Sequence, residues 1–174
     1  MNQSEKRLFL IQSLLNERPS CQKQSIPADS ERQKILLRGL MNVRRPAHIG
    51  TEFLQVQDEY LQNETAAKGI TDIAELTPMQ PGLYLWQGDI TTLKCDAIVN
   101  AANSGLTGCY IPNHRCIDNA IHTFAGVELR LACEELMERQ GYPEPTGQAK
   151  ITPAFNLPCR YVLHTVGPII SGRV

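Results

Sequence analysis

Apolar positions recur at helical spacing throughout the N-terminal part of the chain. The first amphipathic helix is predicted over residues 4–18. Its apolar face carries Leu8, Ile11, Leu14 and Leu15. Asp29 or Ser30 is suited to N-cap a second helix over residues 32–43, which Pro46 would stop.

A third helix is predicted over residues 51–68, with Gly69 as its C-cap. Its apolar contacts would be Phe53, Leu54, Tyr60 and Leu61. Residues 77–82 form a linker by composition, because proline and glycine interrupt any regular pattern there.

After the linker, short apolar runs bounded by turn residues predict four strands. These strands cover residues 83–86, 96–100, 149–152 and 161–166. One helix is predicted from Cys116 to about Arg139, with apolar contacts at Ile117, Ile121, Leu129 and Leu136. Strands that alternate with helices predict an α/β fold with a largely parallel sheet. We therefore expect a helical N-terminal extension (residues 1–76) followed by an α/β domain (residues 77–174).

Composition narrows the class of protein. The chain has 174 residues, of which 42% are hydrophobic and 20% charged, and this excludes wholesale disorder. A net charge of −1 and 6% aromatic residues argue against a nucleic-acid partner or an anionic membrane surface. No apolar run is long enough to span a membrane, and no signal-peptide cleavage site follows the first helix. We expect a cytoplasmic protein whose six cysteines are reduced.

A Gly-Asp turn, Gly88–Asp89, directly follows the first predicted strand. Ligands of open α/β sheets bind outside the carboxyl ends of the strands, where Asp89 could accept hydrogen bonds from a ligand. The alternative is that Asp89 only caps the short segment that follows.

Two asparagines, Asn100 and Asn103, flank two alanines at the end of the second predicted strand. Their amides could bind sugar hydroxyls, and the alanines allow close approach of the backbone. The alternative is a helix cap or an Asx turn.

Cys109, His114 and Cys116 could converge on one metal ion. Three protein ligands with one open position are typical of catalytic zinc, whereas structural zinc normally has four. The alternative is that the cysteines act as small buried hydrophobes and that His114 is a surface residue.

Asp118 is predicted in the first turn of the helix that follows, and His122 lies four residues later on the same face. A carboxylate is favoured at that position by the helix dipole alone. The two residues are either a structural pair or a general acid/base.

Six segments follow one another in the chain: GDIT, DAIVNAANSGLTG, CIDNAIHTFAG, TGQAKIT, NLP and YVLHTVGP. In this order and spacing they resemble the macrodomains, the ADP-ribose-recognising α/β modules. Two features resemble the microbial zinc-containing branch of this family, whose members are protein–ADP-ribosylhydrolases. They are the segment GCYIPNHRCIDNAIH, which starts at Gly108, and the helical N-terminal extension. The resemblance covers the chain from about Ile35 onward and implies a three-layer fold.

The resemblance also implies a role for each candidate residue. Asp89 would accept from the adenine amino group beside the Ile90 backbone, and Asn100 and Asn103 would line the distal ribose. The loop that enters the helix at Cys116 would direct backbone N–H groups at the diphosphate, as is common at a helix N-terminus, and Cys116, Ile117 and Asp118 would be ligand-binding residues. Asp118 and Asn103 would be catalytic, and one Zn²⁺ per chain would be held by Cys109, His114 and Cys116.

The activity that the resemblance implies is zinc-dependent removal of ADP-ribose from mono-ADP-ribosylated protein side chains, with a lipoyl-carrier protein as a candidate substrate. The alternative is a module that binds ADP-ribose or O-acetyl-ADP-ribose without hydrolysis. The family's second phosphate loop would lie beyond the VGP segment, and the sequence stops at Val174. We therefore expect a C-terminally incomplete fold with impaired hydrolysis.

Overall fold

Three helices form the N-terminal layer, as the sequence predicts. The computed structural model describes residues 1–17, 25–168, 170 and 172. The helices are α1 (Gln3–Asn16), α2 (Ser30–Val43) and α3 (Thr51–Lys68). Asp29 caps α2 by accepting from the Arg32 amide. The predicted end of α1 at Arg18 lies outside the described residues.

One apolar core holds these three helices together. Leu8, expected on the apolar face of α1, lies outside this core and is 39% exposed. The core side chains of α1 to α3 are Leu10, Ile11, Leu14, Leu15, Leu37, Leu40, Met41, Phe53, Val56, Tyr60 and Leu61. Val127, which begins α5, joins the same core. The N-terminal helices therefore pack against the α/β part of the chain.

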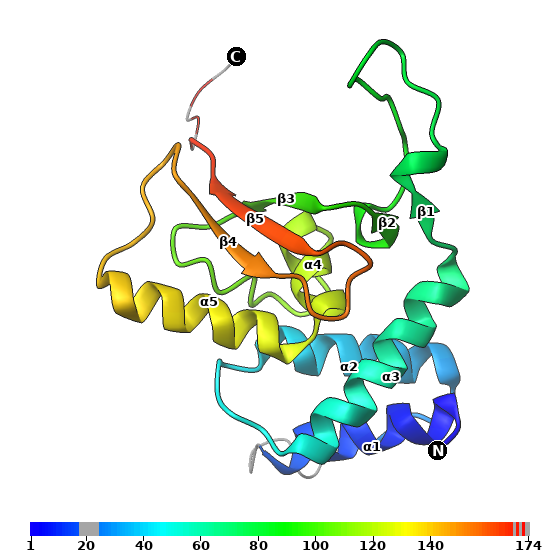
Figure 1. The fold of residues 1–174 in the computed structure, drawn as a ribbon. Coiled ribbons are helices and arrows are strands. Elements are labelled where there is room, and N and C mark those ends of the chain that lie inside the picture. The colour runs from blue at the N-terminus through cyan, green and yellow to red at the C-terminus, as the bar shows by residue number, and fades with distance from the viewer. Residues whose placement is uncertain (18–24, 169, 171, 173–174) are drawn as a thin grey trace.

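The main sheet has three strands, in the order β3 (Ala97–Ala102), β5 (Tyr161–Val166) and β4 (Ala149–Pro153). β3 is parallel to β5, and β4 is antiparallel to it. Two short strands, β1 (Thr71–Asp72) and β2 (Leu93–Lys94), pair in parallel apart from this sheet. Helices α4 (Ile117–Ala125) and α5 (Val127–Gln140) pack on the sheet, and α1 to α3 lie beyond them (Figure 1).

The single helix predicted over residues 116–139 is wrong, because the chain breaks at Gly126. This residue has φ +98°, and a Cβ there would lie 2.6 Å from Nε2 of Gln57 on α3. Oε1 of Gln57 accepts from the Val127 amide at 2.9 Å. The close approach of α3 therefore requires glycine and separates α4 from α5.

The predicted strand at residues 83–86 is also wrong. The segment lies in a loop that projects from the molecule (Figure 1), where the backbone of Leu83 bonds to the nearby Met79 and Gln80 and Leu85 is 78% exposed. A strand requires a neighbouring backbone to satisfy its N–H and C=O groups, and no described segment runs alongside this one.

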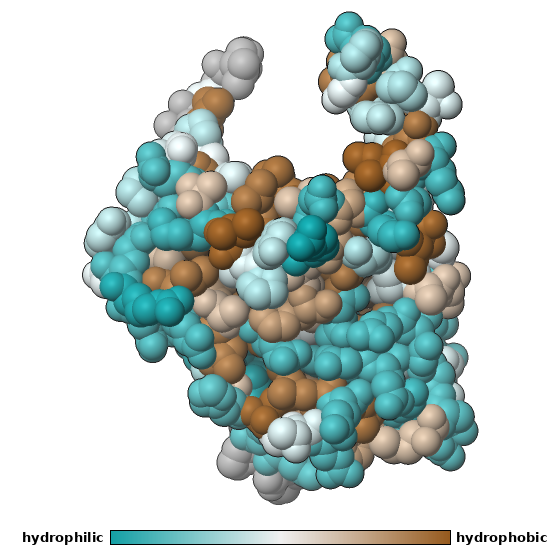
Figure 2. All heavy atoms as spheres, in the orientation of Figure 1, coloured by the Kyte–Doolittle hydropathy of each residue, from teal (hydrophilic) through white to brown (hydrophobic). Residues whose placement is uncertain are grey.

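The two faces of the main sheet differ. The face toward α4 and α5 is closed by an apolar core that includes Ile98, Ile121, Leu129 and Val162. On the other face Val99, Ile151 and Tyr161 are exposed, and Figure 2 shows apolar side chains gathered there.

None of the helices in the described part of the chain is long and apolar enough to cross a membrane.

His164 on β5 is a polar residue within the closed core, with no exposed surface. Burial lowers the pKa of His164 from 6.5 to about 4. Between these two values the unfolded chain binds a proton that the folded chain does not, so stability falls as the pH drops. The difference between the two pKa values corresponds to about 3 kcal/mol of folding stability.

We expect His164→Gln to flatten this pH dependence. The measurement is urea unfolding between pH 7.5 and 4.5, with a chelator present so that metal loss does not contribute. His48→Gln, at an exposed position, is the control and should keep the wild-type slope. Equal slopes for wild type and His164→Gln would contradict the assignment.

Candidate functional site

The loop between β3 and α4, residues 103–116, carries most of the predicted site. Asn103 begins it with an Asx turn, in which its Oδ1 accepts from the Gly105 amide at 2.9 Å and its Nδ2 donates to the Gly108 carbonyl at 3.1 Å. Leu106 anchors the loop in the core with no exposed surface. Gly108 then turns with φ +84° directly against the ring of His122.

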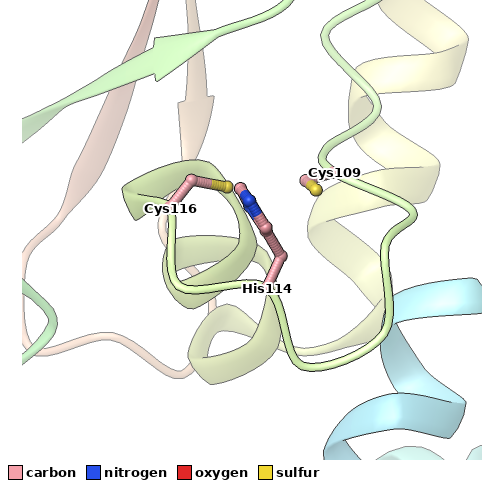
Figure 3. A group of neighbouring side chains, drawn as sticks. All are labelled: Cys109, His114 and Cys116. Atoms are coloured by element: carbon pink, nitrogen blue, oxygen red, sulfur yellow. The ribbon is translucent and has the colours of Figure 1, made fainter.

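Cys109, His114 and Cys116 converge at the end of this loop. Their ligand atoms all lie within 4.8 Å of one another. Figure 3 shows the three side chains turned toward one another, with His114 between the two cysteines. The local cause is a tight turn in which Asn113 has φ +55° and the His114 amide donates to the Ile111 carbonyl.

The chemistry of this donor set fits zinc. Two thiols and one imidazole are preferred zinc ligands, and the described residues supply three of them, which leaves a fourth position open. Burial and the adjacent Cys109 raise the pKa of the Cys116 thiol. A divalent cation would reverse this effect, because coordination deprotonates thiols.

Asp118 lies in the first turn of α4 and is only 5% exposed. Its Oδ1 accepts from Nδ2 of Asn100 at 2.8 Å. Burial raises the pKa of Asp118, and the Asn100 hydrogen bond and the charge of Arg130 partly offset that rise. The carboxylate is therefore buried and held in one orientation at the start of the helix.

The side-chain amide of Asn100 is itself held in place by His164 on the neighbouring strand β5. Its Nδ2 lies 3.1 Å from Nδ1 of His164, whose Nε2 lies 3.0 Å from Oγ1 of Thr152. His164 is neutral, so Nδ1 accepts from Asn100 and Nε2 donates to Thr152. Asn100 has no exposed surface in this structure, and its role toward a ribose stays a prediction.

His122 is the neighbour of Asp118 that the sequence predicts, but the two side chains are not hydrogen-bonded. Nε2 of His122 lies 3.6 Å from Oδ1 of Asp118, and neither ring nitrogen has a hydrogen-bond partner among the described residues. Burial lowers the pKa of His122, and the charge of Arg130 adds to this effect. The pair is therefore not an ion pair.

Asp89 caps the short helix at residues 90–92, as the second of the two interpretations of the Gly88–Asp89 turn predicts. Its Oδ1 accepts from the Thr91 amide and hydroxyl, and Lys68 lies 3.2 Å from Oδ2. Partial burial alone would raise the pKa of Asp89, but these hydrogen bonds outweigh it and lower the pKa. The predicted adenine contacts of Asp89 and Ile90 stay predictions.

Ile117 begins α4 and is 36% exposed. Amides in the first turn of a helix have no intrahelical acceptor, so those of Ile117 and Asp118 are free to meet an anion. Sequence reasoning did not single out His164 or Thr152. The signal was present, since each is a polar residue at an inward position of an otherwise apolar strand.

Comparison with known proteins agrees with this architecture. The macro domain family model matches residues 99–173. A protein-ADP-ribose hydrolase of Treponema medium is 61% identical over the whole chain, which covers 68% of that relative. One of Staphylococcus aureus (strain MRSA252) is 47% identical over 93% of the chain and 61% of the relative. The chain belongs to the macro domain family.

Solved structures of the Trypanosoma brucei macrodomain also resemble this fold. Crystal form 1 is 29% identical with a TM-score of 0.51, over 75% of this chain and 57% of that one. A complex with ADP-ribose is 27% identical with a TM-score of 0.50, over 82% and 61% of the two chains. The α/β macrodomain fold predicted from the sequence is thus confirmed. The chain spans about two thirds of the length of the curated relatives it matches.

Gly108 provides a test of the loop geometry. A Cβ at this position would lie 2.8 Å from the buried His122 ring, whereas at Gly141, with a similar φ of +77°, nothing lies within 4 Å. Gly141→Ala should cost about 1 kcal/mol for the left-handed backbone alone. Gly108→Ala should cost a further ~1–3 kcal/mol from the clash, measured by urea unfolding. Equal losses would show that His122 does not constrain the loop.

Proposed function

We propose that this chain is the ADP-ribose-processing part of a zinc-dependent hydrolase that removes ADP-ribose from mono-ADP-ribosylated protein side chains. The observation that carries the proposal is the convergence of Cys109, His114 and Cys116 at the N-terminus of α4, two residues before the buried Asp118. The relatives named protein-ADP-ribose hydrolase support it at 61% and 47% identity. An ADP-ribosylated protein is the corresponding partner.

Cys109, His114 and Cys116 would hold the zinc ion. When bound, zinc supplies a Lewis acid with one open coordination position, which can polarise an oxygen of the substrate. Cys109 precedes the turn at residues 111–114 and Cys116 follows it, so the loop must keep this turn for the three ligands to meet.

Asp118 is the residue that would accept a proton during hydrolysis. The side-chain contacts that Asp118 makes with Asn100 and His122 both involve Oδ1, so Oδ2 would be the oxygen that takes the proton. Burial raises its pKa toward the range in which a carboxylate accepts and returns a proton. Asn103, exposed at the entrance of the loop, would contact the distal ribose.

The first turn of α4 would bind the diphosphate through the Ile117 and Asp118 amides, and the positive end of the helix dipole favours the same anion. Asp89 would bind the adenine amino group with its carboxylate, and this requires ligand to compete with Lys68 for Oδ2.

The metal assignment predicts about one zinc per chain by elemental analysis. Cys116→Ala should lose most of the metal, because it removes one of three ligands. Affinity should fall with decreasing pH, since thiolates and neutral imidazole are the ligating forms. Cys95→Ala, at a partly buried cysteine outside the cluster, is the control. Metal-free wild-type protein that is fully active would refute the zinc requirement.

The acid/base assignment predicts that Asp118→Ala slows de-ADP-ribosylation by about 10²–10⁴-fold with little change in ADP-ribose affinity. Asp89→Ala should instead weaken ADP-ribose binding about tenfold or more, measured by calorimetric titration. Asp96→Ala, at an exposed position, should change neither. Wild-type protein that binds ADP-ribose without turnover would identify a binding module, and unchanged turnover in Asp118→Ala would refute the catalytic role.

A further inference from the structure

One face of α2 contacts the loop that carries the three candidate zinc ligands. Arg38 and Asn42, one helical turn apart, and Gly39 between them all contact this loop. The residues they meet, Asn113 and His114, are both exposed and belong to no helix or strand. The loop therefore depends on contacts from outside itself for a defined shape.

Arg38 provides the first contact. Its Nη2 donates to the backbone carbonyl of His114 at 3.1 Å and to Oδ1 of Asn119 at 2.9 Å, and its Nε lies 3.3 Å from the same oxygen. The guanidinium thus bonds the backbone of one candidate ligand directly. A planar fork of this kind fixes direction as well as distance.

Asn119 extends the contact to two further residues of the loop, Ile111 and Cys116. Its side-chain Nδ2 donates to the Ile111 carbonyl at 3.1 Å, and its backbone amide donates to Sγ of Cys116 at 3.4 Å. With no exposed surface, Asn119 cannot exchange these partners for water. Arg38 is therefore linked to a second candidate ligand, Cys116, through a single buried residue, whose side chain accepts from Arg38 and whose backbone amide donates to Cys116.

Asn42 provides the second contact, one turn further along α2. Its Oδ1 accepts from the Asn113 amide and its Nδ2 donates to Oγ1 of Thr123 on α4, both at 2.9 Å. Between the two, Gly39 lets the helix approach closely, since a Cβ there would lie 3.1 Å from Nδ2 of Asn113. Asn113 has φ +55°, a conformation that a contact of this kind can hold.

We propose that α2 is part of the metal site, with Arg38 and Asn42 as positioning residues that hold the loop in its ligating shape. This inference rests on the proposed zinc site. A loop that is ordered before the metal binds loses less conformational entropy on binding, so affinity depends on these contacts. Outer partners of metal ligands typically change affinity by about 10–100-fold when removed.

The first test compares Arg38→Lys with Arg32→Lys. Arg38→Lys keeps the positive charge but loses the planar guanidinium that bonds His114 and Asn119. Arg32→Lys changes an exposed arginine of the same helix. Zinc affinity, measured by competition with a chromogenic chelator, should fall by about 10–100-fold in Arg38→Lys and stay at the wild-type value in Arg32→Lys. The visible absorption of Co²⁺ bound in place of zinc should change only in Arg38→Lys.

The second test separates positioning from stability. Gly39→Leu should favour helix formation in α2, since leucine is a better helix former than glycine. Its side chain would meet Pro112 and Asn113 and displace the loop. We expect weaker zinc binding in this variant even where its metal-free melting temperature equals that of wild type.

The outcomes distinguish this inference from the proposal on which it rests. Wild-type protein that binds no zinc through Cys109 and Cys116 overturns both. Wild-type protein that binds zinc, with Arg38→Lys and Gly39→Leu binding it equally tightly, overturns the role of α2 alone. Weaker binding in both variants, with Arg32→Lys unchanged, supports it.

Discussion

The buried polar face of α4 is the constraint on which the rest of the structure depends. Asp118, Asn119 and Thr123 are each at most 5% exposed, and an unpaired buried polar group costs about 1–3 kcal/mol. Asn100 on β3 pairs with Asp118, while Arg38 and Asn42 on α2 pair with the other two. These three side chains are therefore paired only when the sheet lies on one side of α4 and α2 on the other.

Arg130 on α5 forms a second link between the α/β part of the chain and α2. From α5 it donates to the backbone carbonyls of Met41, Asn42 and Arg44, at and just beyond the end of α2, where carbonyls lack intrahelical partners. Its guanidinium also lies 4.3 Å from the ring centre of Tyr110, next to Cys109. The division at residue 76 is thus crossed by polar contacts as well as by apolar packing, and the N-terminal helices contribute to the geometry of the site.

Local patterns account for what the sequence alone determined. The three N-terminal helices, the Asp29 cap and the strand at residues 161–166 depend on spacing and capping within a few residues, and all are confirmed. The same holds for the convergence of Cys109, His114 and Cys116, since eight residues interrupted by a turn can close on themselves. Asp118 at a helix start was likewise predictable from its immediate neighbours.

Tertiary structure decided the features that depend on distant partners. The Leu83–Trp86 segment has strand-like side chains but no neighbouring strand among the described residues, so it lies in a projecting loop. Gly126 breaks a helix because α3 approaches it. Asn100 is directed to Asp118 by His164, 64 residues away in the chain. A hydrogen bond between residues so far apart depends on where folding places them, and the sequence near either residue carries no record of the other.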